Sequence, residues 1–289
     1  MIRWLHAQWQ RIQTARWFLR WPVKTALFLV VLVVVLFPNP FVLSEHINHL
    51  RRVDSLPDPD HPEISVLSAK LDRTLREQQI ADDQAMLQTL ERLVCREVHY
   101  AWDWDLWGAA DYWPTTAEVF AQGREDCDGR AVVAAALLRH RGIDARSVGD
   151  TRHIWVDTPL GPTMNPLGDP IFHYNPDGTT DIAWSRLFDP GPIGFGISVF
   201  PIWRETVLVV ALWLLSQSQW RQVNIILARL AMLLAGLFLI RFAGQDPLAP
   251  IRWLIAVGFL AIIAAVWLES LLSHLLYNKK PTDQYAFSE

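Results

Sequence analysis

Residues Asp111–Pro166 read DYWPTTAEVFAQGREDCDGRAVVAAALLRHRGIDARSVGDTRHIWVDTPLGPTMNP and carry the clearest structural signals of the chain. Within them, CDGRAVVAAALLRHRG is an Ala- and Leu-rich pattern that predicts a helix from Cys127 to a stop at Gly142. After this helix, residues 145–148, 153–157 and 162–164 form short, turn-punctuated segments with β-branched residues, which predict strands.

The residues ahead of this stretch predict further helices. Leucines recur at four-residue spacing from Leu67 to Leu75, and the run Met86–Val98 has helical spacing after two candidate caps, Asp82 and Asp83. Helices followed by strands predict an α+β domain.

The Pro- and Asp-rich SLPDPDHPE and the Gly-rich DPGPIGFG mark the ends of this domain. They predict a linker at 44–62 and a domain at 63–190, the size of one small domain. Residues 45–200 hold 25 acidic and 14 basic residues, a net charge of −11, whereas residues 1–44 hold five basic residues and no acid. Such asymmetry predicts a membrane protein with a polar domain on one side.

The composition of the whole chain excludes several classes of protein. Two cysteines cannot form a disulfide framework, and a net charge of −4 offers no overall basic surface for nucleic acid. A mean hydropathy of +0.14 is high for a soluble enzyme. The membrane bilayer is therefore the first partner that we expect, and nucleic acid is not expected.

The N-terminal region predicts a membrane anchor. Residues 25–44 are uncharged and contain ALFLVVLVVVLF, which predicts transmembrane helix 1 at 23–43. In an alternative, Pro38 and Pro40 end this helix early, the segment from Trp21 supplies the missing length, and Lys24 snorkels to the interface. No A-x-A-like site follows the run, which favours an uncleaved anchor. Tryptophans alternating with arginines at 1–22 predict a cytoplasmic segment in the membrane interface.

Three apolar stretches near the C-terminus, 206–220, 223–240 and 253–276, predict transmembrane helices 2–4 within 191–278. The first, about 22 Å long, spans only if residues 200–203 join it and Arg204 and Glu205 reach the headgroups. Four spans place both termini, including the tail 279–289, in the cytoplasm and the domain outside it. Arg229 and Glu269 lie at similar depth, which predicts an ion pair between the third and fourth spans.

Cys127 is the candidate nucleophile. A cysteine at a helix N-terminus faces free N–H groups and the positive end of the helix dipole, which favour the thiolate. Asp126 and Asp128 oppose that effect. Gly129 has no Cβ and would let a substrate or another segment approach closely. The alternative is a buried cysteine that acts only as a small apolar residue. Cys95 is predicted to be structural, and a Cys95–Cys127 disulfide would abolish the chemistry.

His153 is the candidate base, because a thiol nucleophile needs a neighbouring base and imidazole can serve at neutral pH. It lies 26 residues after Cys127, in a predicted strand. Asn165 would lie beside it and orient the ring if the next segment pairs as a hairpin. Asp169 is the alternative orienting residue. A histidine that is merely hydrogen-bonded in a strand is the non-catalytic alternative.

Tyr112–Pro166 resembles the transglutaminase-like superfamily, whose papain-type core has Cys in a G-x-D/E-C setting, a His-x-Trp strand and an Asp-Pro on the next strand. The corresponding segments here are REDC ending at Cys127, HIW beginning at His153, and NP beginning at Asn165. LWGAADYWPTTAEVFAQGREDCDGRA is similar, more narrowly, to bacterial transglutaminase-like cysteine proteases, periplasmic enzymes that cut surface adhesins. The resemblance covers about 70 residues around the cysteine. It implies a papain-like α+β domain inserted between an N-terminal transmembrane helix and a bundle of about three more.

The resemblance implies Cys127 as nucleophile, His153 as general base and acid, and Asn165 as the orienting residue. Family members usually have Asp at the position of Asn165, and an amide can still accept the imidazole N–H but supplies no charge. Arg124 stands where the family often has Gly, which narrows the approach to the thiol. Trp113 is a second candidate oxyanion donor beside the Cys127 backbone N–H. The neighbouring tryptophans are candidates for a substrate cleft or for packing: Trp102, Trp104 and Trp107.

The expected function is that of a multi-pass inner-membrane thiol enzyme that cleaves a peptide or isopeptide bond in a periplasmic or cell-surface protein. Transfer to a second amine, which crosslinks proteins, is the alternative within this class. A catalytically idle domain that binds or senses a ligand and relays through the bundle is the alternative from another class, with a membrane-protein partner on the C-terminal helices. The resemblance implies no obligatory cofactor. Asp126 and Asp128 flank the cysteine as acids do in relatives that use calcium, so calcium is the one candidate ion.

Overall fold

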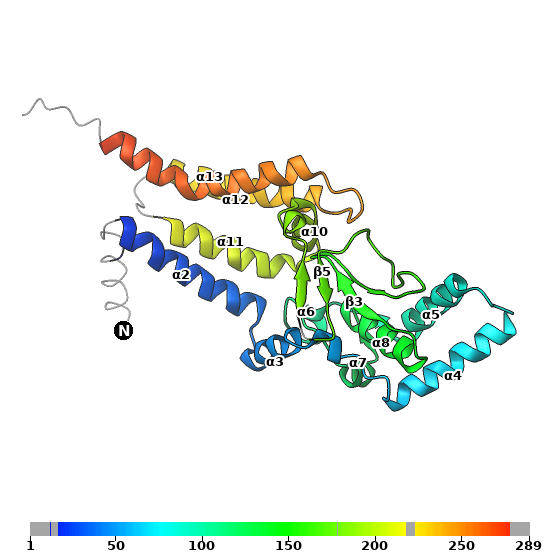
Figure 1. Ribbon diagram of the computed structural model, residues 1–289. Coiled ribbons are helices and arrows are strands. Elements are labelled where there is room, and N and C mark those ends of the chain that lie inside the picture. Colours follow the sequence, from blue (N-terminus) through cyan, green and yellow to red (C-terminus); the bar gives the residue numbers. More distant parts are fainter. Residues whose placement is uncertain (1–11, 13–16, 178, 218–222, 278–289) are drawn as a thin grey trace, which may run out of the picture. The chain divides into compact units, whose positions relative to one another are not determined.

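The computed structural model describes residue 12 and residues 17–177, 179–217 and 223–277, with side chains as far as residue 268 in the last range. The chain is a mixed α+β protein (Figure 1), as the sequence predicts. It divides into two compact units: unit 1 comprises Met1–Val35 and Ile197–Glu289, and unit 2 comprises Leu36–Gly196. Each unit has its own hydrophobic cluster.

Helices dominate the first part of unit 2. They are α3 (Pro40–Leu50), the 3-10 turn η1 (Val53–Ser55), α4 (Pro62–Glu77), α5 (Asp83–Glu97), α6 (Asp103–Leu106), α7 (Thr116–Gln122) and α8 (Cys127–His140). The predicted helices over 67–75, 86–98 and 127–141 correspond to α4, α5 and α8. The Asp82 carboxylate caps α5 by accepting a hydrogen bond from Ala85 N at 2.8 Å, as predicted.

An antiparallel sheet forms the second part of unit 2, with strand order β4-β3-β5-β6. Its strands are β3 (Arg146–Gly149), β4 (Ile154–Asp157), β5 (Phe172–Tyr174) and β6 (Thr180–Ile182). The segment 162–164, predicted as a strand, is reduced to one bridge between Val156 and Thr163. Two further strands pair in parallel, β1 (His99–Tyr100) with β2 (Arg124–Glu125). The short helix α9 (Trp184–Leu187) follows β6.

Helix α8 lies at the centre of unit 2. Every residue from Ala131 to Leu138 is fully buried, so the helix has no solvent-facing side over two turns. Helices α4, α5 and α7 contact it, and so do β3 and β4 of the sheet. This burial explains the Ala-rich sequence, because small side chains let several elements approach one helix closely. The helix stops before Gly142, whose φ of 76° is the left-handed conformation predicted for it.

The predicted linker at 44–62 is wrong for most of its length. Pro40–Leu50 forms α3, and Val53 and Leu56 are buried in the core of unit 2. The Leu56 carbonyl accepts hydrogen bonds from the Thr116 N–H at 3.3 Å and hydroxyl at 3.2 Å. The Pro- and Asp-rich composition therefore marks turns inside the unit rather than its boundary.

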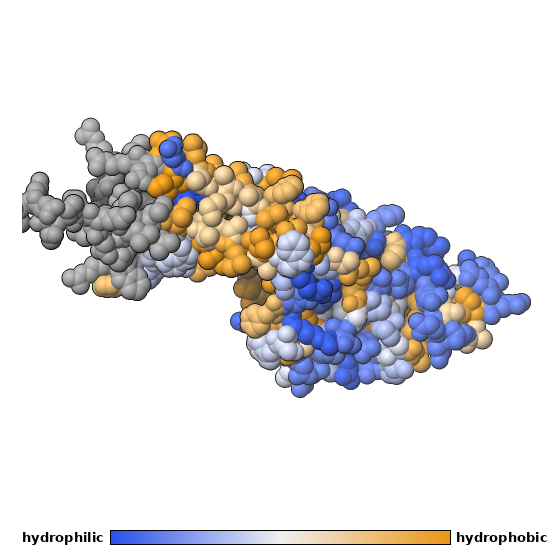
Figure 2. Space-filling model, turned by 90° about the horizontal axis from the view of Figure 1, so that it is seen from above, coloured by the Kyte–Doolittle hydropathy of each residue, from blue (hydrophilic) through white to orange (hydrophobic). Residues whose placement is uncertain are grey.

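Unit 1 consists of apolar helices, with α2 (Trp17–Leu36), α11 (Ile202–Ser216), α12 (Val223–Ala243) and α13 (Arg252–Tyr277). Helix α10 (Pro190–Val199) starts in unit 2 and ends in unit 1. Figure 2 shows hydrophobic side chains over much of the described surface of unit 1, whereas hydrophilic side chains predominate on unit 2. Helices α12 and α13 cross closely, since a Cβ on Gly236 would lie 2.6 Å from the Gly258 carbonyl oxygen.

Two helices among the described residues are long and apolar enough to cross a membrane, Phe18–Leu36 and Val223–Ala243. Helices α10 and α11 together form a third candidate, bent by 112° at the break between them, and Arg252–Leu268 is a shorter apolar helix. Helix α2 ends at Leu36, before Pro38 and Pro40, so the predicted helix boundaries 23–43 are wrong and the alternative, an earlier end with the segment from Trp21 included, is the better description.

Four charged residues of unit 1, Lys24, Arg204, Glu205 and Arg229, are buried rather than exposed at its surface. Lys24 is buried and donates from Nζ to the Gln217 carbonyl at 2.8 Å, so it does not snorkel outward. Arg204 and Glu205, expected to reach the headgroups, are also buried, and Glu205 pairs with Arg241 at 2.7 Å. The reason is that helix packing supplies polar partners within the unit.

Arg229 is buried and donates to Ser216 Oγ at 2.6 Å, Gln217 Oε1 at 2.7 Å and the Ala265 carbonyl at 2.8 Å. The side chain of Glu269, its predicted partner, lies outside the described residues. So do most of the segment 1–22 and the whole tail 279–289.

Candidate functional site

Cys127 is the first residue of α8, as predicted. The Asp126 side chain caps the helix by accepting a hydrogen bond from Asp128 N at 3.3 Å. Cys127 and Cys95 are both free thiols, so the alternative disulfide is not formed. The close approach predicted at Gly129 is made by Glu125, whose Cγ would lie 2.5 Å from a Cβ at that position.

The surroundings of Cys127 favour the neutral thiol. Burial, followed by the charge of Asp126, raises the pKa of Cys127 well above its usual range. A hydrogen bond from the Ile154 backbone N–H to the sulfur opposes this rise. Desolvation and the acidic neighbours thus shift the pKa of Cys127 in the direction opposite to the effect of a helix N-terminus, which the sequence pattern emphasised.

His153 was predicted to lie in the strand 153–157. It lies instead in the turn between β3 and β4, one residue before β4 begins. The turn is held by Asp150, whose Oδ1 accepts from Arg152 N at 2.7 Å and from His153 N at 3.2 Å. Gly149 permits this tight turn, because a Cβ there would lie 2.5 Å from the His153 carbonyl oxygen. Ile154, whose N–H meets the Cys127 sulfur, is the next residue, so the turn brings His153 to the thiol side of α8.

The His153 ring donates its Nε2–H to the main-chain carbonyl of Met164 at 2.8 Å. A carbonyl oxygen only accepts, so the proton lies on Nε2 and Nδ1 of the neutral ring keeps its lone pair. Nδ1 is therefore the nitrogen that can take a proton from a thiol. Within the described residues, no hydrogen bond links the His153 ring to the Cys127 sulfur.

The orienting acceptor is therefore not the side chain of Asn165. Asn165 follows Met164 with a φ of 58°, and its side chain is exposed. The hairpin pairing ends at Thr163, and the left-handed turn after it points the Met164 carbonyl at the ring in place of the amide. Asp169, the alternative, forms a surface ion pair with Arg186 at 2.7 Å.

Trp113 is buried and packs edge-on against Tyr174, with ring centroids 5.0 Å apart. Its carbonyl accepts a hydrogen bond from His49 Nδ1 at 2.6 Å. No hydrogen bond of its indole N–H is recorded among the described residues, so its oxyanion role stays a prediction. Trp107 donates to Glu125 Oε1 at 2.7 Å and is a packing residue. The remaining tryptophans of this region stack on one another with centroids 4.6 Å apart: Trp102 and Trp104.

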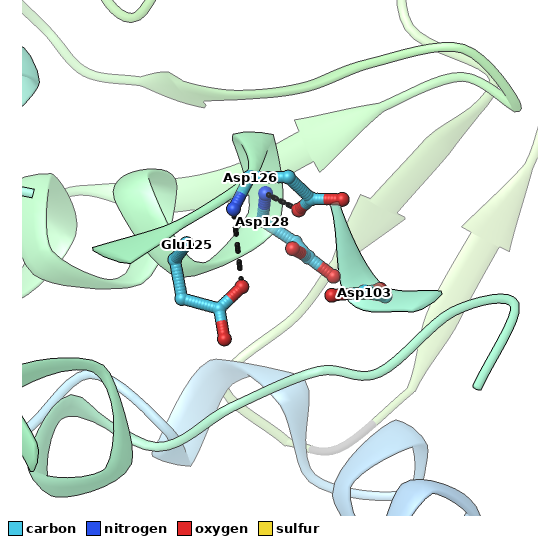
Figure 3. A group of neighbouring side chains, drawn as sticks. All are labelled: Asp103, Glu125, Asp126 and Asp128. Atoms are coloured by element: carbon cyan, nitrogen blue, oxygen red, sulfur yellow. Dashed lines mark hydrogen bonds between the residues drawn. The ribbon is translucent and has the colours of Figure 1, made fainter. Parts of the chain in front are cut away.

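A cluster of carboxyl groups surrounds the start of α8. Figure 3 shows Asp103, Glu125, Asp126 and Asp128, of which Asp103 and Asp128 turn their carboxyl groups toward each other. One potential ligand atom from each of the four lies within 4.8 Å of the others. The parallel pairing of β1 with β2 brings the first turn of α6, with Asp103, next to the acids that flank Cys127.

The carboxyl groups of this cluster are poorly solvated. Burial raises the pKa of Glu125 to about 7, and burial together with Asp126 raises the pKa of Asp103 and of Asp128 well above the usual range. Asp103 is 2% exposed, and its Oδ2 accepts from Tyr112 N at 2.6 Å. Its Oδ1 is buried with no hydrogen-bond partner among the described residues.

This donor set fits a hard divalent cation. Calcium binds oxygen ligands at about 2.4 Å, so two ligands on opposite sides of the ion lie about 4.8 Å apart. The buried Oδ1 of Asp103 supplies an acceptor to which none of the described residues donates. Of the four acids, Glu125, Asp126 and Asp128 lie within two residues of the cysteine in the sequence, whereas Asp103 joins them only through the fold.

Sequence reasoning missed three groups that shape the site. Asp150 carried a readable signal, because an acid three residues before His153 is typical of an Asx turn. The Met164 carbonyl carries no residue-specific signal, since every residue has one. Glu91, on α5, accepts hydrogen bonds from the turn that holds Met164 and is more than 70 residues away in the sequence. No protein-family model, curated protein or solved structure matches the chain.

Proposed function

We propose that the chain is a membrane-anchored thiol acyl-transfer enzyme of transglutaminase-like type, with a papain-like domain in unit 2, that hydrolyses an amide bond of a protein or peptide. One observation carries the proposal: the Cys127 sulfur meets the backbone of Ile154, while the adjacent His153 is held as the Nε2–H tautomer by the Met164 carbonyl. A thiol and the free lone pair of an oriented imidazole are the two parts that nucleophilic catalysis by cysteine needs.

The reaction starts from a neutral thiol, because the pKa of Cys127 is raised. Nδ1 of His153 takes the thiol proton as the sulfur attacks the amide carbonyl, and a tetrahedral oxyanion forms. The backbone N–H of Cys127, in the first turn of α8, is the donor available for that oxyanion. His153 then gives the proton to the departing amine, and the C–N bond breaks to leave a thioester on Cys127. Water, deprotonated by His153, attacks the thioester and releases the acid.

Labelling with iodoacetamide tests this proposal in the full chain in detergent micelles. Cys127 should react faster than Cys95, which serves as the internal control, and His153→Ala should slow Cys127 at least tenfold. His173→Ala, an exposed histidine of β5, should leave the rate unchanged. The enzymatic proposal is lost if Cys127 reacts no faster than Cys95 and His153→Ala has no effect.

Transfer of the acyl group to a second amine is the alternative within this class. It differs only in whether water or an amine attacks the thioester, so a fluorescent primary amine added with a casein substrate separates the two. Incorporation of the amine indicates crosslinking, and released peptides without incorporation indicate hydrolysis.

A catalytically idle binding or sensing domain is the second candidate function. The raised pKa of Cys127 and the exposed side chain of Asn165 favour it. This function predicts slow labelling of Cys127 that does not depend on His153. It also requires the C-terminal helices to transmit the signal of a bound ligand. The partner would then be another membrane protein that contacts the C-terminal helices.

We further propose that the acidic cluster binds calcium as a structural ion beside the nucleophile. The support is the buried Oδ1 of Asp103, which has no hydrogen-bond partner in the described part of the chain, and the distance of at most 4.8 Å between candidate ligand atoms. Calcium should raise the melting temperature of the full chain. In Asp103→Asn, the calcium concentration needed for the same rise should be more than tenfold higher. Asp105→Asn, an exposed acid on the same helix α6, is the matched control. Equal responses of the two variants would remove the calcium proposal.

For the cellular arrangement we propose four spans, with unit 2 outside the cytoplasm and both termini inside it, in the inner membrane of a bacterium. The basic N-terminal segment and the apolar helices of unit 1 support this topology. Labelling with a membrane-impermeant maleimide in intact cells tests it. A cysteine placed at the exposed Asp177 should react, and one placed at Lys279 should not. The opposite pattern would reverse the proposed orientation.

A further inference from the structure

The turn that orients His153 contains two consecutive non-glycine residues in the left-handed region, Met164 with a φ of 67° and Asn165 with a φ of 58°. Asn tolerates this conformation, whereas Met rarely adopts it. A strained turn of this kind persists only where its surroundings hold it. The residues that hold it are therefore of interest for the site.

Glu91, on α5, makes the contacts that hold the turn. Its Oε2 accepts from Met164 N at 2.9 Å, from Asn165 N at 3.3 Å and more weakly from Thr163 Oγ1 at 3.5 Å. Successive backbone N–H groups directed at one carboxylate oxygen form an anion-binding turn. The carboxylate thus stabilises the conformation that the Met164 side chain disfavours.

The same conformation directs the Met164 carbonyl to His153. With the amides of Met164 and Asn165 facing Glu91, the carbonyl oxygen of Met164 accepts from Nε2 of the ring at 2.8 Å. Thr163, the first residue of the turn, is bonded to Val156 of β4 through two backbone hydrogen bonds, of 2.9 and 3.1 Å. The turn is therefore fixed at one side by the strand that follows His153 and at the other by α5.

We propose that Glu91 is a positioning residue for the base: through the turn 163–165 it holds His153 as the Nε2–H tautomer, with Nδ1 free to accept the thiol proton. The expected effect of Glu91 on the reactivity of Cys127 rests on the proposed thiol chemistry. The effect of Glu91 on the tautomer of His153 does not. Among the described residues, no hydrogen bond joins Glu91 to His153 or Cys127, so Glu91 acts through the turn. Loss of the carboxylate lets the turn relax, and the carbonyl then leaves the ring.

Two measurements on the full chain in micelles test the proposal. Nitrogen-15 NMR of labelled histidine reports the tautomer of His153, assigned by comparison with His153→Ala, and iodoacetamide labelling from pH 5 to 9 reports the base. In Glu91→Ala the Nε2–H tautomer should lose its dominance. The labelling rate of Cys127 should fall by up to about a hundredfold, the effect of a misplaced catalytic group.

Three variants separate positioning from general stabilisation. Glu91→Gln keeps an oxygen acceptor and should stay within threefold of the original rate. Glu97→Ala, on the same helix, removes ion pairs with Lys70 at 2.8 Å and with Arg96 at 3.7 Å, and should change neither measurement. Adding Asn165→Gly to Glu91→Ala makes the left-handed conformation easier to adopt and should restore part of the tautomer and of the rate.

The proposal is overturned if Glu91→Ala leaves the tautomer and the pH profile unchanged, or if Glu91→Gln is as slow as Glu91→Ala. Failure of the thiol chemistry itself looks different. In that case His153→Ala leaves the labelling rate of Cys127 unchanged, while Glu91→Ala still shifts the tautomer of His153 in the NMR spectrum.

Discussion

His46, on α3, is predicted to make unit 2 lose stability in mild acid. It is 6% exposed and lies against Phe37 and Tyr112, with ring centroids 5.3 and 6.4 Å away. Its Nδ1 is buried without a hydrogen-bond partner among the described residues. Burial, followed by the charge of His49, lowers the pKa of His46 from 6.5 to about 4. The carboxylate of Asp111 lies 3.6 Å from Nε2 but is 57% exposed, so it does not offset the burial.

The sign of the effect follows from the two pKa values. Above pH 6.5 the ring is neutral in both states, and its full contribution to stability is present. As the pH falls from 6.5 to about 4, the unfolded chain binds a proton that the folded chain does not, so stability is lost. The pKa of His46 differs by about 2.5 between the two states, and each pKa unit corresponds to about 1.4 kcal/mol. The stability lost is therefore about 3 kcal/mol.

The assay compares the wild-type chain with His46→Phe, which keeps an aromatic ring and removes the titration. The free energy of unfolding is measured in micelles by tryptophan fluorescence at pH 7 and pH 4. His46→Phe should lose about 3 kcal/mol less than the wild type over this range. The comparison is made between the two chains because Glu125, whose pKa is raised to about 7, changes the pH dependence of stability in the opposite direction. This contribution is the same in both chains and cancels in their difference. His173→Gln, an exposed site, is the control. Equal losses in the wild type and His46→Phe would refute the reasoning.

Three other substitutions test the packing. Gly129→Ala puts a Cβ 2.5 Å from Glu125 Cγ and should cost about 1–3 kcal/mol of unfolding free energy despite the better helix propensity of Ala; a gain in stability would contradict this. Glu205→Ala leaves Arg241 without its carboxylate and should cost roughly 3 kcal/mol, partly recovered by adding Arg241→Met, as judged by thermal unfolding in micelles. Asp82→Ala removes the cap of α5 and should cost about 1 kcal/mol in denaturant unfolding, and no change would argue against the cap.

The sequence predicts the elements whose signals are local. The start of α8 at Cys127, its stop before Gly142 and the Asp82 cap all depend on side chains within one turn of the helix end. Strands β5 and β6 were not predicted, because each has three residues, FHY and TDI, which are too few to show a strand period. The composition of 44–62 was misread for a different reason. Prolines and acidic residues occur in tight turns within a packed unit as well as in linkers.

Only those parts of the site that are formed by distinctive side chains could be predicted from the sequence. Cys127 and His153 are distinctive residues, but the acceptor for the ring is a main-chain carbonyl that no residue type reveals. Asp103 joins the other three acids through a pairing of two-residue strands, which is set by the tertiary fold. Whether the thiol, the ring and the acids act together stays a prediction that the labelling experiments test.

The packing of residues 36–56 decides where a soluble fragment can be cut. These residues hold the loop 110–116 at three points. Ala110 N donates to the Leu36 carbonyl at 2.8 Å, His49 Nδ1 donates to the Trp113 carbonyl at 2.6 Å, and Thr116 N donates to the Leu56 carbonyl at 3.3 Å. A fragment beginning at residue 63 discards all three partners and uncovers the core where Val53 and Leu56 packed, whereas one beginning at residue 36 keeps them. Protein made for crystallisation or enzymology should therefore retain Leu36, the last residue of α2.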